Sequence, residues 1–428
     1  MSTTTVPAST AQHPVPRDLE RPREVVRHLG PNWFASVMGT GIVANAAATL
    51  PLQFPGLRTA ATVVWAGAAL LLLVLAAAWT VHWIRHRDIA LAHGNNPVMS
   101  QFYGAPPMAL MTVGAGALLL GKDWIGMDAA VAVDWTLWLA GTVLGLLAAC
   151  TIPFRMITRH KAAPDAAFGG WLMPVVPPMV SAAMGALLIP HTPAGQPRLT
   201  MILACLAMFG ISLFAAFLVI NMIFSRLVHQ DMPAAGTVPT LWIVLGPLGQ
   251  AVTAAGLLAN AAPVALPAQY AHGLAVFAAV FGVVTWGFAM LWLALAAAVT
   301  IRTARTTGLP FNLTWWGFTF PVGTCVTASS GLAVRTGADL FHWAAVALYV
   351  LLLTAWAVTA FRTGRGPCAA PSSCPRPPLP RPPPLAEAVR EPGSRSRDRG
   401  PLAVRYHHRL PLPLRTPDDL TRRHHGGT

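Results

Sequence analysis

Long apolar runs separated by short polar segments fill most of this chain, from about residue 32 to residue 361. Several runs are long enough to cross a hydrocarbon core of about 30 Å with some tilt. The pattern predicts an all-α membrane domain at 31–362 between a short tail, 1–30, and a tail rich in Pro and Arg, 363–428, for which disorder is predicted. The ten predicted spans are 32–50, 59–83, 101–120, 132–156, 171–190, 199–225, 239–260, 271–300, 314–334 and 340–361.

An aromatic residue introduces every second predicted span. The five residues are Trp33, Tyr103, Trp171, Trp242 and Trp316, about 70 residues apart, a period that holds two spanning helices and their connections. Because a two-helix unit returns the chain to its starting side, successive units share one orientation and are related by an axis along the membrane normal. The repeat predicts ten transmembrane helices arranged as five helical hairpins around a central pore, with pseudo-fivefold symmetry.

The odd-numbered spans carry a glycine or proline break soon after the aromatic residue, whereas the even-numbered spans are uniformly apolar. Proline inside a helix removes a hydrogen bond and kinks it, and within a membrane the freed backbone groups need protein or water as partners. The odd-numbered spans are therefore predicted to face the axis, around an opening of roughly 3 Å radius that one phenylalanine would block. The residues predicted to line the pore or kink its helices are Gly39, Gly41, Pro106, Pro107, Pro177, Pro178, Pro247 and Pro321.

Composition and charge agree with a membrane protein and set its orientation. The chain is 54% hydrophobic and 10% charged, against about 25% charged residues in a typical soluble domain. Its net charge of +14 does not indicate nucleic acid, because the basic residues gather in the tails and in loops on one side. The N-terminal tail and the loops after even-numbered spans hold twelve Lys and Arg residues, and the opposite loops hold four, Arg58, Lys122, Arg198 and Arg335. The positive-inside rule predicts that both termini are cytoplasmic. We expect a multi-pass protein of the cell (inner) membrane, in contact with lipid. No cleaved signal peptide is expected, because the segment from Trp33 is the first member of the repeat.

No Asp, Glu, Lys or Arg is predicted in the middle of a span, and this absence favours passive conduction or facilitated exit. Entry of a proton together with the anion is also compatible, because it needs no buried relay. Asp134 and Asp339 stand at predicted helix starts, where N-capping is the preferred interpretation. For the polar residues within spans, interhelical hydrogen bonding is preferred to substrate contact. These residues are Asn45, Asn221, Gln250 and Asn260.

The cysteines and histidines indicate no disulfide framework, metal centre or cofactor. Three cysteines lie within apolar spans and two, Cys368 and Cys374, in the C-terminal tail. The pairs His407-His408 and His424-His425 have no coordinating company. A membrane-embedded haem or redox protein is an alternative of another class, but His82, His272 and His342 lie near span ends rather than paired at mid-depth. We therefore expect neither catalytic residues nor an enzyme.

Three segments carry a family resemblance: Pro31 to Gly41 (PNWFASVMGTG), Trp171 to Pro178 (WLMPVVPP) and Asn312 to Pro321 (NLTWWGFTFP). Together they resemble the tellurite-resistance/dicarboxylate transporter family of the voltage-dependent anion channel superfamily. This family includes bacterial tellurite-resistance proteins, plant slow anion channels, yeast malate permease and fungal sulfite pumps. The resemblance covers about residues 30 to 362.

The resemblance implies a ring of five hairpins, a homotrimer with one pore in each subunit, and a phenylalanine that closes the pore. Matching the motif of the ninth span assigns this gate to Phe320, with Phe318 at a position that is often tyrosine in plant members. An apolar ring in a narrow pore excludes water, and an anion does not cross such a gap cheaply. The tail of about 30 residues before the first span puts kinase-driven opening, as in plant members, in doubt.

The implied function is transport of small anions, such as a C4-dicarboxylate like malate, sulfite, chloride or a tellurite-related oxyanion. Proton-linked uptake of malate or succinate is the alternative mechanism, and a purely structural scaffold is the alternative without transport. The sequence does not identify the anion, the direction of transport or the regulatory trigger.

Overall fold

The computed structural model describes residues 26–160, 162–163 and 165–365, and within them it contains helices and connections but no β-strand. The all-α prediction is therefore confirmed for this part of the chain. The predicted disordered tail at 363–428 lies almost wholly outside the described residues, as do its cysteines and histidine pairs and residues 1–25 of the N-terminal tail.

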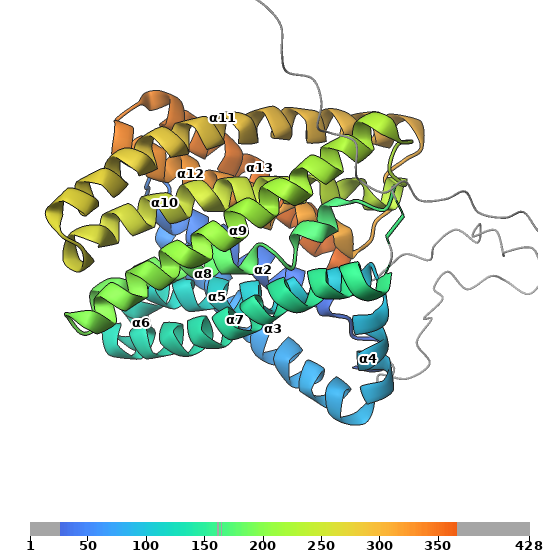
Figure 1. The fold of residues 1–428 in the computed structure, drawn as a ribbon, viewed down its shortest axis with the longest axis horizontal. Coiled ribbons are helices and arrows are strands. Elements are labelled where there is room, and N and C mark those ends of the chain that lie inside the picture. Colours follow the sequence, from blue (N-terminus) through green and yellow to red (C-terminus); the bar gives the residue numbers. More distant parts are fainter. Residues whose placement is uncertain (1–25, 161, 164, 366–428) are drawn as a thin grey trace, which may run out of the picture. The chain divides into compact units, whose positions relative to one another are not determined.

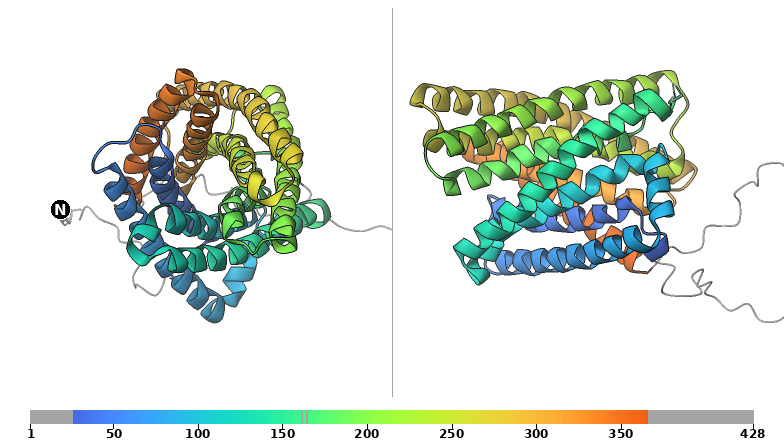
Figure 2. Two further views of the ribbon diagram at one scale, coloured as in Figure 1. Left: turned by 90° about the vertical axis from the view of Figure 1, so that its left-hand side faces the viewer. Right: turned by 60° about the horizontal axis from the view of Figure 1, so that its bottom comes forward.

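The long helices form an inner group and an outer group that surrounds it (Figure 1, Figure 2). The inner helices are α2 (Phe34–Thr49), α5 (Ala105–Gly116), α8 (Pro177–Leu188), α10 (Leu245–Ala265) and α12 (Phe320–Thr336). The outer helices are α3 (Leu57–Arg85), α7 (Met127–Arg155), α9 (Gln196–His229), α11 (Ala268–Thr306) and α13 (Asp339–Gly364). The short helices α4 (Arg87–Asn95) and α6 (Lys122–Ile125) lie in connections, and the π-turns η3 (Ala117–Gly121) and η4 (Met156–His160) extend α5 and α7.

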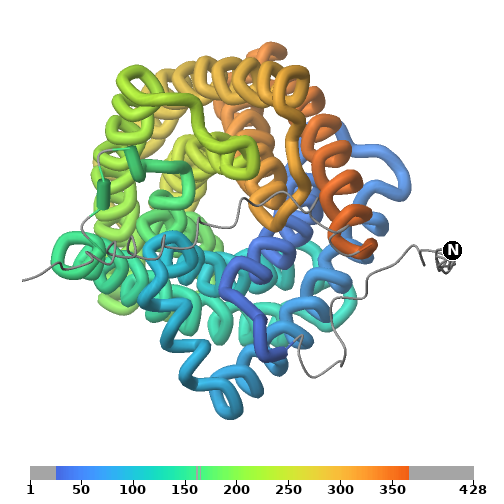
Figure 3. The backbone as a smooth tube through the Cα atoms, turned by 90° about the vertical axis from the view of Figure 1, so that its right-hand side faces the viewer, coloured from blue at the N-terminus to red at the C-terminus, as the bar shows by residue number. Residues whose placement is uncertain are grey.

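The inner helices close into a ring. Around it α2 packs against α5, α5 against α8, α8 against α10, α10 against α12, and α12 against α2. Each inner helix also packs against the outer helix that follows it in the chain, and that outer helix returns to the starting end (Figure 3). All five inner helices therefore run in the same direction.

Eight helical segments in the described part of the chain are long and apolar enough to cross a membrane, so the chain is a multi-pass membrane protein. Burial separates them into two groups. Only 22–33% of the most apolar window is buried in the segments of α3, α7, α9, α11 and α13, against 78–83% in those that contain α5, α10 and α12. The prediction that even-numbered spans face lipid and odd-numbered spans lie inside agrees with this difference. The predicted spans 32–50 and 171–190 are not among the eight, because α2 has 16 residues and α8 has 12.

A 3₁₀ segment precedes every inner helix, and each one contains the repeat's aromatic residue. These segments are η1 (Pro31–Trp33), η2 (Met99–Gly104), η5 (Gly169–Leu172), η7 (Ala235–Val244) and η8 (Leu313–Phe318). The α-helices that follow have their prolines in the first turn, at Pro106 and Pro107, Pro177 and Pro178, Pro247, and Pro321. A first-turn proline leaves no hydrogen bond unmade and fits the helical φ angle. The prediction of interior kinks is wrong at these positions, since the prolines mark helix starts.

Glycine lets the inner helices approach closely. The side chain of Ile42 in α2 lies directly on Gly323 of α12, and the backbone of Thr324 would be 2.6 Å from a Cβ on Gly249 in α10. In lipid the hydrophobic effect does not favour helix association. Close van der Waals contacts at small residues therefore stabilise the ring. The candidate site lies at the centre of this ring.

Candidate functional site

A small apolar cavity lies near the starting ends of the inner helices. Its volume is about 30 Å³, room for one or two water molecules. The cavity is lined from all five repeat units, and no ionisable side chain borders it in the described part of the chain. Its lining includes Met38, Phe102, Met108, Val176, Pro247 and Phe320.

A larger cavity of about 570 Å³ lies further along the same helices. On α2 the small cavity is bordered by Met38 and the large one by Ile42; on α10 the corresponding residues are Pro247 and Gln250. These three or four residues are about one helical turn, whereas six to eleven residues, about two to three turns, separate the two linings on α12, α8 and α5. Because the inner helices are parallel, the two cavities lie along one path through the ring.

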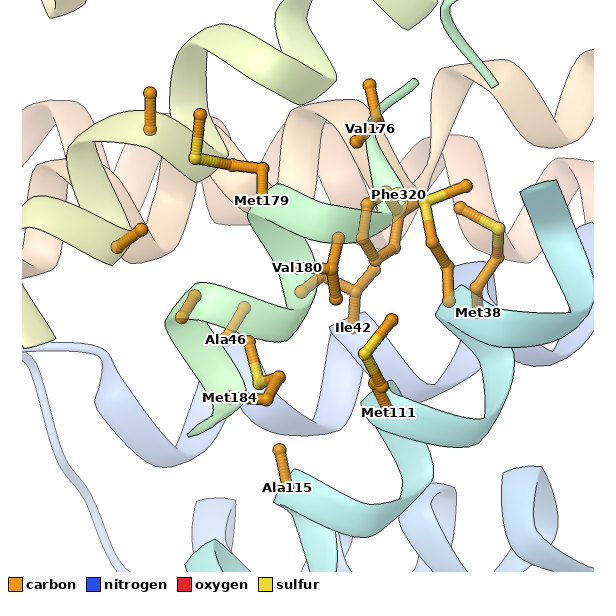
Figure 4. Packing of buried hydrophobic residues seen from close by; sticks show 14 of the residues in the cluster. Met38, Ile42, Ala46, Met111, Ala115, Val176, Met179, Val180, Met184 and Phe320 are labelled. Carbon is orange, nitrogen blue, oxygen red and sulfur yellow. The ribbon is translucent and has the colours of Figure 1, made fainter. Parts of the chain in front are cut away.

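Phe320 stands between these cavities. Its side chain is 3% exposed and borders the small cavity. Figure 4 places it in one apolar cluster with Met38 and Ile42 of α2 and Val180 of α8. Since Ile42 borders the large cavity, these side chains form the layer that divides the path.

Phe318 is placed differently. Its ring packs edge-on against Trp242, with ring centroids 5.2 Å apart, and against Trp315, with centroids 5.6 Å apart. It does not border either of the two central cavities. The geometry is that of a packing residue and gives the predicted gate role of Phe318 no support.

The glycines and prolines predicted to line the pore divide into two groups. Pro247 and Pro321 border the small cavity. The others lie in helix contacts: Gly39 faces Trp316 and Thr319, and Gly41 faces Thr112. The remaining positions of this second group are Pro106 and Pro107, which border a separate cavity with α3 and α7, and Pro177 and Pro178, which are buried at the start of α8.

Residues 28–364 match the family described as voltage-dependent anion channel. The chain belongs to the voltage-dependent anion channel family. The match covers almost the whole described part of the chain, so the predicted resemblance is confirmed and applies to the helical ring and both cavities.

Individual relatives of this family are described as transporters. An uncharacterized transporter of Methanocaldococcus jannaschii is 28% identical over 341 residues, 79% of this chain and 94% of the relative. A sulfite efflux pump of Arthroderma otae is 28% identical over 346 residues, 77% of this chain and 88% of the pump. A malic acid transport protein of Schizosaccharomyces pombe is 21% identical over 351 residues, 77% of this chain and 76% of the relative. Anion transport is therefore the function of the family, without a specific substrate for this chain.

Four polar residues predicted to bond between helices have different surroundings in this family member. Asn45 Nδ2 donates to the Thr112 carbonyl at 3.0 Å, and Asn260 Oδ1 accepts from Arg335 Nη2 at 2.7 Å, so the prediction is confirmed for these two. Asn221 is exposed on α9. Gln250 is 1% exposed and borders the large cavity, and its Nε2 has no partner among the described residues.

Arg335, predicted in a loop, lies instead in a helix and was not predicted as a site residue. Arg335 lies in the last turn of α12 and is the one charged side chain among the described residues that border the two central cavities. The available signal was its distance of one residue from the predicted span 314–334. Arg335 therefore borders a cavity inside the ring.

The N-capping interpretation is wrong for both aspartates. Asp339 is the first residue of α13, after an Ala338 cap without a side-chain bond. Asp134 lies inside α7 and is fully buried, its carboxyl group packs on Gly114 of α5, and neither carboxyl oxygen has a partner among the described residues. Helix α7 begins five residues before the predicted span 132–156, so Asp134 lies about 10 Å along the helix, inside it but short of its middle.

A histidine contact in the connection after α3 predicts pH-dependent stability. The ring of His93 in α4 stacks on that of His82, with centroids 5.5 Å apart. Burial, followed by the nearby His82 and His28, lowers the pKa of His93 from its ordinary 6.5. Above pH 6.5 the neutral imidazole therefore contributes its full stabilisation, and this is lost as the pH falls and the unfolded chain takes up the proton first. We expect a lower thermal midpoint in detergent at pH 5.5 than at pH 7.5.

The variant His93→Gln should reduce this pH difference, whereas His272→Gln, at an exposed site, should leave it unchanged. An equal pH difference in parent and His93→Gln would contradict the assignment to His93.

Proposed function

We propose that this chain conducts small anions across the membrane through the ring of inner helices, along the path that joins the two cavities. The observation that carries the proposal is the pair of cavities inside the ring: no acidic side chain among the described residues borders them, and Arg335 is their one charge. A neutral passage with a fixed cation at one mouth favours anions over cations. The sulfite pumps and malic acid transport protein among the relatives make sulfite and C4-dicarboxylates the first substrates to test.

The proposal includes ten spans arranged as five hairpins with both termini cytoplasmic. The inner helices α2 and α8 are short, about 24 Å and 18 Å at 1.5 Å per residue, but 3₁₀ segments extend them and the outer helices shield them from lipid. Arginines at the ends of the outer helices α3, α7, α9 and α11 and at the start of α4 support a cytoplasmic location for the starting end of the ring. They are Arg85, Arg87, Arg155, Arg226, Arg302 and Arg305. A homotrimer in the cell membrane remains a prediction of the family resemblance.

We assign the gate of this path to Phe320. Its neighbours in the dividing layer are aliphatic or thioether side chains, which offer an anion no hydrogen bond. An anion crossing this layer loses its water without compensation, so the closed ring is a barrier.

Flux into liposomes tests the proposed function. Purified protein is reconstituted, and the uptake of sulfite, malate and chloride is compared with that of a cation, rubidium, and with protein-free liposomes. Uptake of one or more anions above the protein-free level, without rubidium uptake, is expected. No anion uptake by either the parent or a Phe320→Ala variant that remains folded would rule the proposal out.

Asp134 favours a second candidate mechanism, proton-linked anion uptake. An intramembrane carboxyl group with no hydrogen-bond partner is by default a candidate for binding a proton. Asp134 meets this description in α7, against the inner helix α5. Protonation or deprotonation of Asp134 would change the charge next to α5, a helix of the inner ring.

If this mechanism operates, an inward pH gradient at fixed voltage should speed malate uptake by the parent, and Asp134→Asn should abolish the response while uptake at equal pH persists. The side chain keeps its shape but no longer titrates. Asp339→Asn, at the exposed start of α13, is the matched control and should keep the response. A parent whose uptake ignores the gradient would leave passive conduction as the mechanism.

A further inference from the structure

The large cavity contains a buried amide donor that nothing satisfies. Gln250 projects from α10 at the end of the cavity next to the dividing layer, is 1% exposed, and its Nε2 has no partner in the described part of the chain. A buried donor without an acceptor is costly, so native proteins pair such groups with protein, water or ligand. Gln250 therefore marks a position where an acceptor is required.

The hydroxyl protons in the cavity lining are already engaged. Ser330 Oγ donates to the Val326 carbonyl at 2.9 Å, Thr327 Oγ1 donates to the Thr324 carbonyl at 3.0 Å, and Thr49 Oγ1 is within reach of the Asn45 carbonyl at 3.1 Å. The fourth hydroxyl, Thr253 Oγ1, lies 2.8 Å from Thr327 Oγ1, and since Thr327 donates to backbone, the proton between the two comes from Thr253. An incoming ligand meets Gln250 and Arg335 as its free donors.

Arg335 is held in place without being neutralised. Its Nη2 donates to the Gly256 carbonyl at 3.0 Å and to Asn260 Oδ1 at 2.7 Å, both on α10. These are neutral acceptors, and no carboxylate pairs with Arg335 among the described residues, where the salt bridge is Arg58 with Asp123. The Nε and Nη1 groups have no protein acceptor in the same region, so the guanidinium keeps donors and its full charge for a ligand.

We propose that the large cavity is a binding site for oxyanions, in which Arg335 captures the anion at the outer part and Gln250 receives it beside the dividing layer. Gly256, which anchors Arg335, lies six residues beyond Gln250 on α10, about 9 Å along the helix. The two positions thus act in sequence, and the cavity of about 570 Å³ holds either a sulfite or a C4-dicarboxylate. The planar guanidinium matches the paired oxygens of carboxylate or sulfite and gives no such advantage to a halide. This inference rests on the proposed function and adds the class of anion to it.

Binding to the purified full chain in detergent tests the site without any flux. The probes are sodium sulfite, sodium malate and sodium chloride at equal ionic strength, and the readout is the apparent dissociation constant from thermal stabilisation. Sulfite, malate or both should stabilise the parent at lower concentrations than chloride does. Stabilisation by only one oxyanion identifies the preferred class and supports the site.

Variants separate charge from geometry. Arg335→Gln should weaken oxyanion binding about tenfold or more, the loss of one charge-assisted hydrogen bond, and Gln250→Met, which keeps the volume without a donor, should also weaken it. Arg335→Lys should keep attraction for anions but lose the preference for oxyanions. Arg58→Gln is the matched control, because Arg58 is exposed at the same end of the ring and borders neither central cavity.

Equal stabilisation of the parent by chloride and oxyanions would overturn the site, as would Arg335→Gln and Arg58→Gln binding alike. The two proposals fail separately. Selective binding without liposome flux would reject conduction and keep the site, and anion flux without oxyanion preference would reject the site and keep conduction.

Discussion

Replacing Phe320 by alanine should raise anion flux through reconstituted protein by about tenfold or more. The phenyl ring is 3% exposed in the layer between the two cavities, and its removal joins them into one wetted path. A fall of 1.4 kcal/mol in the barrier gives a tenfold rate, and the cost of desolvating an anion at an apolar constriction exceeds that value. Liposome flux of sulfite and malate at matched protein density measures the effect.

Phe318→Ala is the matched control for this variant. It removes the same side chain two residues away, from a position packed between Trp242 and Trp315 and away from both cavities. It should lower thermal stability without raising flux. If Phe320→Ala stays folded by size-exclusion chromatography and conducts no better than the parent, the gate does not lie at Phe320. A rise in flux in Phe318→Ala alone would move the gate to that residue.

Gly169→Ala should destabilise the fold by about 3 kcal/mol, the upper end of the range for overpacked sites. A Cβ on Gly169 in η5 would overlap the backbone carbonyl of Thr240 in η7, and a carbonyl cannot move aside as a flexible side chain can. The segments η5 and η7, which precede the neighbouring inner helices α8 and α10, are in contact at this point. The added methyl group would therefore strain the starting end of the ring. Chemical denaturation in detergent measures the loss.

Gly210→Ala provides the comparison. Gly210 lies within α9, and a Cβ there would meet nothing within 4 Å. Without a clash, alanine should leave stability unchanged or raise it by about 0.5–1 kcal/mol through lower backbone entropy in the unfolded chain. Equal stability of the two variants would show that the η5–η7 contact is not tight in solution.

The repeat could be predicted because one aromatic residue marks the start of each unit. Trp33, Tyr103, Trp171, Trp242 and Trp316 each fall in a 3₁₀ segment that opens an inner helix. Apolar composition also predicted the outer helices well, since a lipid-facing helix reads as an unbroken apolar run. Phe320 was reached through the family motif, and its spacing alone does not distinguish a pore residue from a packed one.

Other features depend on contacts that the sequence does not display. Helices α2 and α8 lie within the predicted spans 32–50 and 171–190, but their short lengths of 16 and 12 residues were not predicted, because they depend on burial among other helices. Asp134 was misread because a span boundary uncertain by a few residues decides whether a carboxyl group caps a helix or is buried in it. The role of Arg335 was not predicted, because the positive-inside rule uses only the number of arginines on each side of the membrane. It does not tell which arginines border an internal cavity.

Cysteine accessibility tests most directly the central claim that anions pass inside the ring. The experiment uses Thr253→Cys, in the lining of the large cavity, in a chain that also carries Phe320→Ala. Cys150→Ser removes the exposed thiol among the described residues, and Cys368→Ser and Cys374→Ser remove the two thiols of the C-terminal tail. The matched control is Thr136→Cys, the same substitution on the exposed face of α7. A negatively charged thiosulfonate should block most sulfite flux after labelling the thiol introduced by Thr253→Cys and leave the control unchanged. Full labelling of that introduced thiol, verified by mass, with undiminished flux would show that anions do not travel through this ring.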